Sequence, residues 1–114
     1  MNAVAVPDAQ DRYVHALLRE YLDLPDTPAK ARPPDRTLAR SLFAQDVPLD
    51  LVRAAFALAS ARRESRPPTS PQLQPVRSLH YFLPVLEELR LSNPEPAYLA
   101  RLLARHTTSP GPTP

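Results

Sequence analysis

Residues 48–63 read PLDLVRAAFALASARR, and their apolar side chains recur at the spacing of an α-helix. Alanine at five positions between 54 and 61 favours helix formation and keeps this segment thin, so neighbouring helices can approach closely. Phe56 lies on the inward stripe together with Val52 and Ala59, and we expect it to fill space at the centre of the core. The stretch predicts an all-α fold built around this helix, with Pro48 at its first position.

Further helices are predicted on both sides, at residues 8–24, 36–45, 84–91 and 94–106. Asp35 and Asn93 each stand where an N-cap side chain would begin a helix, and Ser78 would cap a turn at 79–83. Pro84 cannot lie inside an ordinary helix, so we expect the chain to bend there and restart. No segment alternates at period two over the length of a strand. We predict a small orthogonal bundle of four to five helices.

Length and proline content indicate a single domain. A chain of 114 residues suffices for one core, and domains usually have about 100–150 residues. We divide it into a flexible N-terminus (1–7), a helical domain (8–106) and a disordered tail (107–114). Proline-rich connectors are expected at 25–34 and 64–77, each with four prolines. We expect the second connector to be a mobile surface loop without a core anchor, and the tail to be detached.

Composition argues against several classes of function. Without cysteine there is no disulfide, thiolate nucleophile or cysteine-ligated metal, and with one glycine there is no phosphate-binding glycine loop and no GxSxG elbow. His15, His80 and His106 have no second histidine one helical turn away. We therefore expect no catalytic residues, no cofactor and no metal site. The N-terminal residues do not resemble a signal peptide, and no apolar run nears the ~20 residues of a membrane span, so we expect a cytoplasmic protein without membrane contact.

Positive charge is concentrated in the middle of the chain. The net charge is only +2, but residues 35–77 hold seven basic and four acidic side chains. Five of these arginines define a predicted basic lobe: Arg53, Arg62, Arg63, Arg66 and Arg77. Because guanidinium groups pair bidentately with phosphate and stack on bases, the lobe suggests DNA or RNA as a partner. The alternative is a solvated face in a chain whose arginine content reflects GC-rich codon usage.

Two adjacent residues extend this candidate site. His80 and Tyr81 precede the predicted bend at Pro84 and could stack on a base or on a partner side chain. Arg62 and Arg63 close the central helix, where we expect both to be exposed, so that replacing the pair with alanine should weaken nucleic-acid binding and leave the fold intact. Arg36 and Arg40 stand one turn apart on their helix, and either phosphate contact or an exposed surface explains them.

Part of the chain resembles a known family. Residues 38–63, LARSLFAQDVPLDLVRAAFALASARR, followed by a loop and SLHYFLPVLEEL at 78–89, resemble helical DNA-associated modules of bacterial replication-initiation and mobile-element proteins, including the DnaD-like C-terminal domain. The resemblance lies in a short helix, a turn, an alanine-rich helix ending in basic residues, and a Ser/Tyr-led helix, and it covers less than half of the chain. It implies DNA binding or contact with a replication complex, with Tyr81 and the arginines closing the alanine-rich helix as the matching positions.

Two hypotheses about function follow. The first is a small bacterial accessory protein that binds nucleic acid through the basic lobe in a replication or mobile-element complex. The second is a protein-interaction adaptor that docks through its first helix or through the proline-rich stretch 66–75, RPPTSPQLQP, whose extended conformation suits a partner groove. Salt dependence separates them, because each phosphate contact on duplex DNA contributes a log–log slope of about −0.9. The sequence does not indicate the oligomeric state.

Overall fold

A computed structural model describes residues 8–67, 69–71 and 73–107. The elements in chain order are α1 (Ala9–Leu22), α2 (Pro33–Ala44), α3 (Leu49–Glu64), the 3-10 turn η1 (Leu79–Phe82), α4 (Leu83–Ser92) and α5 (Pro96–Thr107). The prediction of an all-α bundle is confirmed for the described residues. The segments 1–7 and 108–114, predicted to be flexible and disordered, lie outside them, and Thr107 belongs to α5.

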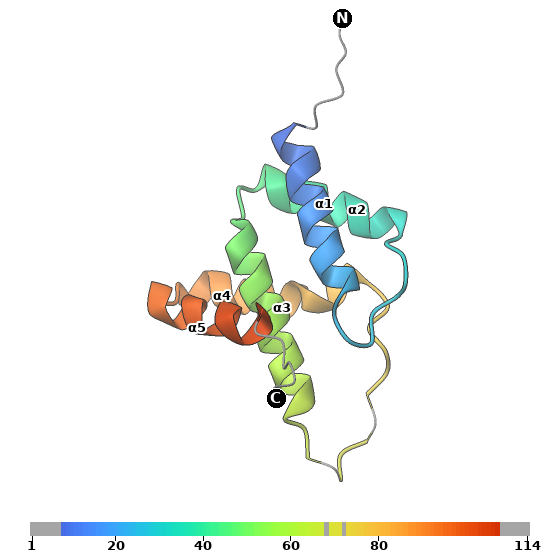
Figure 1. Cartoon of the computed structure of the whole chain (residues 1–114), viewed down its shortest axis with the longest axis vertical. Coiled ribbons are helices and arrows are strands. Elements are labelled where there is room, and N and C mark those ends of the chain that lie inside the picture. The colour runs from blue at the N-terminus through green and yellow to red at the C-terminus, as the bar shows by residue number, and fades with distance from the viewer. Residues whose placement is uncertain (1–7, 68, 72, 108–114) are drawn as a thin grey trace, which may run out of the picture.

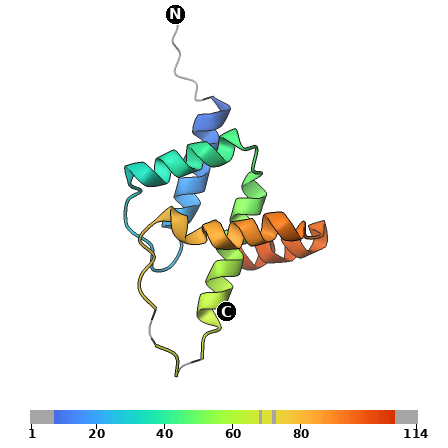
Figure 2. The ribbon, with the colours of Figure 1, turned by 180° about the vertical axis from the view of Figure 1, so that it is seen from behind.

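Helix α3 is the central element: α1, η1, α4 and α5 contact it, whereas α2 packs mainly on α1 (Figures 1 and 2). α1 and α2 cross each other at the end where α3 begins, and α4 and α5 both contact α3 further along, crossing it steeply. The segment after α3 extends beyond the end of that helix and returns to η1. The high alanine content of α3 explains this arrangement, because small side chains let several helices approach one axis.

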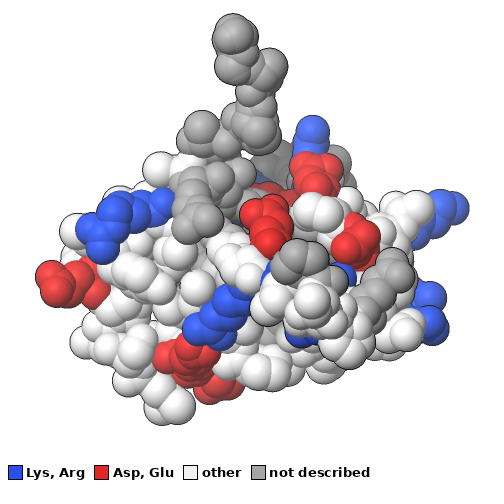
Figure 3. All heavy atoms as spheres, turned by 90° about the horizontal axis from the view of Figure 1, so that it is seen from below, with Lys and Arg blue, Asp and Glu red and all other residues white. Residues whose placement is uncertain are grey.

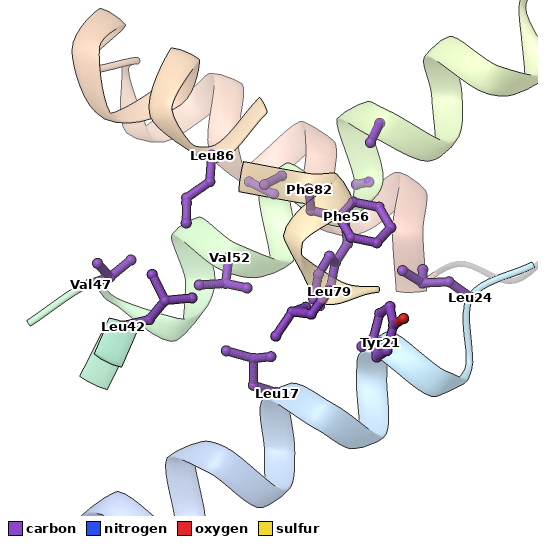
Figure 4. Packing of buried hydrophobic residues seen from close by; sticks show 14 of the residues in the cluster. Leu17, Tyr21, Leu24, Leu42, Val47, Val52, Phe56, Leu79, Phe82 and Leu86 are labelled. Atoms are coloured by element: carbon purple, nitrogen blue, oxygen red, sulfur yellow. The ribbon is translucent and has the colours of Figure 1, made fainter. Parts of the chain in front are cut away.

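The core lies where α1, α3 and η1 meet (Figure 4). Phe56 is 1% exposed, and its ring packs edge-on against Phe82 with 4.9 Å between centroids. The ring of Tyr21, from α1, packs edge-on against Phe82 as well, with 6.0 Å between centroids. The predicted central position of Phe56 is therefore confirmed, and the aromatic cluster joins segments far apart in the sequence.

Several helix boundaries follow the predicted local signals. The first helix, predicted from residue 8, begins at Ala9, and Asp8 is its N-cap, accepting a hydrogen bond from the backbone N–H of Asp11 at 2.8 Å. Ser78 caps η1, since its hydroxyl accepts from the N–H of His80 at 3.1 Å. Pro84 lies in the first turn of α4, where its missing N–H breaks no helical bond. The predicted bend before Pro84 is present as η1.

The predicted start of the second helix is wrong. α2 begins at Pro33 rather than Arg36, because proline is well suited to a first helical turn, so the connector ends at residue 32. Asp35 is not the N-cap but lies inside that turn, and it is only 1% exposed. Its carboxylate accepts from the backbone N–H of Arg32 and from that of Leu79, both at 2.9 Å. Asp35 therefore ties the start of α2 to the start of η1.

The roles predicted for Asn93 and Pro48 are also wrong. Asn93 ends α4 in the left-handed region, with φ 46° and ψ 60°, and α5 begins only at Pro96. Asparagine tolerates this conformation better than most residues, so here it stops one helix instead of starting the next. Pro48 precedes α3 in an extended conformation, with φ −61° and ψ 139°.

The segment after α3 has a core anchor that the sequence-based prediction denied it. Glu64 still belongs to α3, and Val76 is buried at 3% exposure. The backbone N–H of Val76 donates to the carbonyl of Asp26 at 2.8 Å, which ties this segment to the connector between α1 and α2. Proline content alone did not reveal this attachment, because the partner carbonyl is distant in sequence.

Candidate interaction surfaces

The structure brings four of the seven predicted site residues together. Arg62, Arg63, Arg66 and Tyr81 line one hollow of about 330 Å³ beside the C-terminal end of α3. Arg53, Arg77 and His80 do not line it. The hollow lies at the end of α3 where unpaired carbonyl groups carry partial negative charge, and this disfavours a bound anion.

Arg62 forms a bidentate ion pair with an acidic residue of the same chain. Its two terminal nitrogens donate to the two carboxylate oxygens of Glu88 in α4, at 2.8 and 2.6 Å. These hydrogen bonds raise the pKa of Arg62 and lower that of Glu88, because each ion stabilises the charged form of the other. The bidentate geometry resembles the way arginine binds phosphate, but here a carboxylate of the same chain occupies the guanidinium.

Arg63 joins four segments of the fold. Its guanidinium donates to the Tyr81 hydroxyl at 3.1 Å, the Asp26 carboxylate at 3.1 Å and the Gln74 carbonyl at 3.2 Å. The same group lies 5.5 Å from the centroid of the Tyr81 ring, within the range of a cation–π contact. With a side chain only 14% exposed, Arg63 is not the free surface arginine that the sequence predicted.

The remaining predicted residues occupy varied environments. Arg53 forms ion pairs with Glu20 and Asp50, and so ties α3 to α1. Arg66 donates to the Pro71 carbonyl at 2.9 Å, and the His80 ring contacts the Ser78 hydroxyl at 3.0 Å. Arg77 is exposed. Figure 3, which views the end where α3 stops, shows acidic groups interspersed with basic ones. Of the five arginines in the predicted lobe, three are therefore ion-paired within the chain.

A second surface lies between α1, residues 29–31 and α2, and we call it the α1–α2 groove. Its volume is about 560 Å³. Apolar side chains line it: Val14, Leu18, Leu22 and Ala31. Basic side chains also line it: Arg19, Lys30, Arg36 and Arg40. Asp11 is the acidic residue at this surface, and His15 lies there as well.

The four basic residues of the groove differ electrostatically from the predicted lobe. None forms an ion pair with another residue in the described part of the chain. The two on α2, Arg36 and Arg40, are exposed and stand one turn apart. The groove therefore combines an apolar lining with four cations that form no ion pair within the described residues, beside the single carboxylate of Asp11.

Sequence reasoning noticed part of this surface but did not assign it. The pair Arg36 and Arg40 was visible in the sequence, as was the apolar row Val14, Leu18 and Leu22 at four-residue spacing. Leu17, Leu18 and Tyr21 are buried in the core, whereas Val14 and Leu22 are only half-buried. Which of these side chains is covered depends on how α2 crosses α1, so the spacing alone could not separate them.

The described residues hold neither a metal-binding cluster nor a membrane-spanning helix. They contain no group of three or more histidine, aspartate or glutamate side chains placed to hold a metal ion. None of the helices they form has the length and apolar character needed to cross a membrane. Comparisons found no matching protein-family model, characterised protein or solved structure. The resemblance to DNA-associated modules therefore stays a prediction.

Proposed function

We propose that the chain is a protein-interaction module and that its α1–α2 groove binds an amphipathic helix of a partner protein. The observation that carries this proposal is the apolar lining of the groove, formed by side chains such as Val14 and Leu22 that the core leaves half-buried. Amphipathic helices dock into such grooves by inserting apolar side chains from one face.

The position of the groove also favours this function. Its walls are two helices whose other faces are fixed in the core through Leu17, Tyr21 and Leu42. A rigid site loses little conformational entropy when a partner binds. This reading agrees with the sequence-based hypothesis of an adaptor that docks through its first helix.

A labelled amphipathic helix of about 15 residues, with a leucine stripe and a glutamine polar face, tests the proposal by fluorescence anisotropy. Val14→Asn and Leu22→Asn, made separately, should each weaken binding about tenfold, because they place an amide in the apolar lining. Leu91→Asn is the matched control, since Leu91 is 84% exposed and lies outside the groove. Circular dichroism verifies that each variant is folded. Equal weakening by all three variants, or no saturable binding to the parent, would contradict the proposal.

Nucleic-acid binding by the predicted lobe is the second candidate, and with it the role in a replication or mobile-element complex. Its support is the convergence of Arg62, Arg63, Arg66 and Tyr81 on one hollow. Phosphate would have to compete with Glu88 for Arg62 and with Asp26 for Arg63. We therefore favour helix binding at the α1–α2 groove over nucleic-acid binding at the predicted lobe.

An anisotropy titration against single- and double-stranded DNA at two salt concentrations tests this second candidate. If the lobe binds phosphate, Arg62→Ala with Arg66→Ala should weaken binding and flatten the log–log salt slope by up to about 2. Arg101→Ala is the control, because Arg101 lies on α5 and contacts Tyr98 rather than the hollow. Absence of DNA binding at about 50 mM salt would exclude this candidate.

A further inference from the structure

Resting on the proposed function, we infer that the α1–α2 groove selects an acidic amphipathic helix, whose apolar stripe is flanked by carboxylates on both sides. The basic residues come from every segment that borders the groove. Arg19 projects from α1, Lys30 from the connector, and Arg36 and Arg40 from α2. Against these four cations the surface holds one carboxylate, that of Asp11.

Unlike three arginines elsewhere in the molecule, the groove cations are available to pair with a partner's carboxylates. Arg53, Arg62 and Arg63 each hold a carboxylate of the same chain, and a partner would have to displace it. The groove cations have no ion pair within the described residues, so a partner carboxylate can bind without breaking one. Complementary charge accelerates association and disfavours partners of like charge.

The apolar lining argues for a protein helix over a nucleic-acid backbone. A phosphate backbone would satisfy Arg36 and Arg40 but would leave Val14 and Leu22 against polar atoms and water. A helix with leucines on one face and glutamates beside them covers the apolar lining and pairs with the basic residues of the groove at the same time. The charge should also be asymmetric along the partner, because Asp11 lies near the start of α1 and Arg19 two turns further on.

Three helical peptides with the same leucine stripe test the inference. Their flanking positions carry glutamate, glutamine or lysine, and binding to the full chain is measured by anisotropy at low and at high salt. The glutamate peptide should bind about tenfold more tightly than the glutamine peptide, and the lysine peptide more weakly than both. The advantage of glutamate should shrink at high salt, because these charges are exposed to solvent.

Charge reversal at the groove, compared with the same reversal elsewhere on the molecule, gives a second test. Arg36→Glu with Arg40→Glu should reverse the preference from the glutamate peptide to the lysine peptide. Arg66→Glu with Arg77→Glu changes the net charge by the same amount outside the groove, and it should keep the original preference. Should the variant with Arg36→Glu and Arg40→Glu fail to fold, binding of the three peptides to the parent chain still shows whether the groove selects an acidic helix.

The outcomes separate this inference from the proposed function. Equal affinity for all three peptides, sensitive to Val14→Asn, would overturn charge selection and leave the groove as a helix-binding site. Failure of every peptide to bind would overturn both. Binding of DNA that depends on Arg36 and Arg40, without peptide binding, would overturn both and identify the groove as a phosphate-binding surface.

Discussion

The hydroxyl groups of two tyrosines in α1 have contrasting surroundings. The Tyr13 hydroxyl donates to the Val47 carbonyl at 2.8 Å, whereas the buried Tyr21 hydroxyl has no hydrogen-bond partner among the described residues. An unpaired buried polar group costs about 1–3 kcal/mol, and removing it leaves a well-packed ring. We expect Tyr21→Phe to raise the free energy of unfolding by about 1 kcal/mol and Tyr13→Phe to lower it by a similar amount. Urea denaturation measures both. Changes of the same sign in the two variants would contradict this assignment.

Arg62 and Arg63 are adjacent in sequence but have different structural roles. Arg63→Ala removes three hydrogen bonds from a largely buried side chain, so we expect a loss of about 2 kcal/mol. Arg62→Ala breaks one exposed ion pair and should cost less than about 1 kcal/mol. Thermal unfolding of the two single variants measures the difference. Equal melting temperatures would show that Arg63 does not join these segments. The double substitution, expected from the sequence to spare the fold, is therefore unsuited to testing nucleic-acid binding.

The end of α4 depends on the backbone conformation of a single residue. Asn93 adopts positive φ, a conformation that costs most other L-residues about 1–2 kcal/mol and glycine very little. Asn93→Ala should therefore destabilise the chain by about 1 kcal/mol, and Asn93→Gly should be nearly neutral. The comparison is made by chemical denaturation of both variants. If alanine were tolerated as well as glycine, a left-handed helix end at this position would be wrong.

Helix identities were predictable because they depend on local spacing. The apolar spacing, the cap residue Ser78 and the first-turn proline Pro84 act over one or two turns of chain. The cap roles given to Asp35 and Asn93 failed for a physical reason. Aspartate and asparagine suit several positions near helix ends, and tertiary contacts choose among them. For Asp35 the choice came from the N–H of Leu79, which lies far along the sequence.

The stability of the whole molecule should fall steeply at high pH. Burial raises the pKa of Tyr13 to about 12, and burial followed by the nearby Asp35 carboxylate raises that of Tyr21 to about 12. An unfolded tyrosine loses its proton near pH 10, so between about pH 10 and 12 the unfolded chain binds fewer protons than the folded one. The stabilising contribution is complete below pH 10 and is lost as pH rises through 12.

Urea midpoints at pH 9, 10 and 11 test this expectation. The parent should weaken progressively above pH 10, and the double variant Tyr13→Phe with Tyr21→Phe should weaken less over the same interval. Measurements from pH 7 to 9 provide the baseline, because neither tyrosine ionises there in either state. An identical decline in parent and variant would assign the alkaline sensitivity to other groups.

The candidate site was less predictable than the fold. The predicted lobe relied on arginines that are close in sequence, yet Glu20, Glu88 and Asp26 reach three of them from other elements. The groove unites α1, the connector and α2, and its cations are distributed over these three consecutive segments. Charge density along the chain does not report which charges remain unpaired, because pairing is decided by distance in space.

The sequence by itself determined the all-α architecture, the interior position of Phe56 and the bend before Pro84. Each follows from periodicity or proline chemistry, which act within a few residues. Only the tertiary structure decided that Asp35 is buried, that Arg63 is a structural contact and that the row Val14, Leu18 and Leu22 borders a groove. Those outcomes depend on how α1 and α2 cross and where η1 returns, and such long-range packing brings together groups whose separation along the chain carries no local signal.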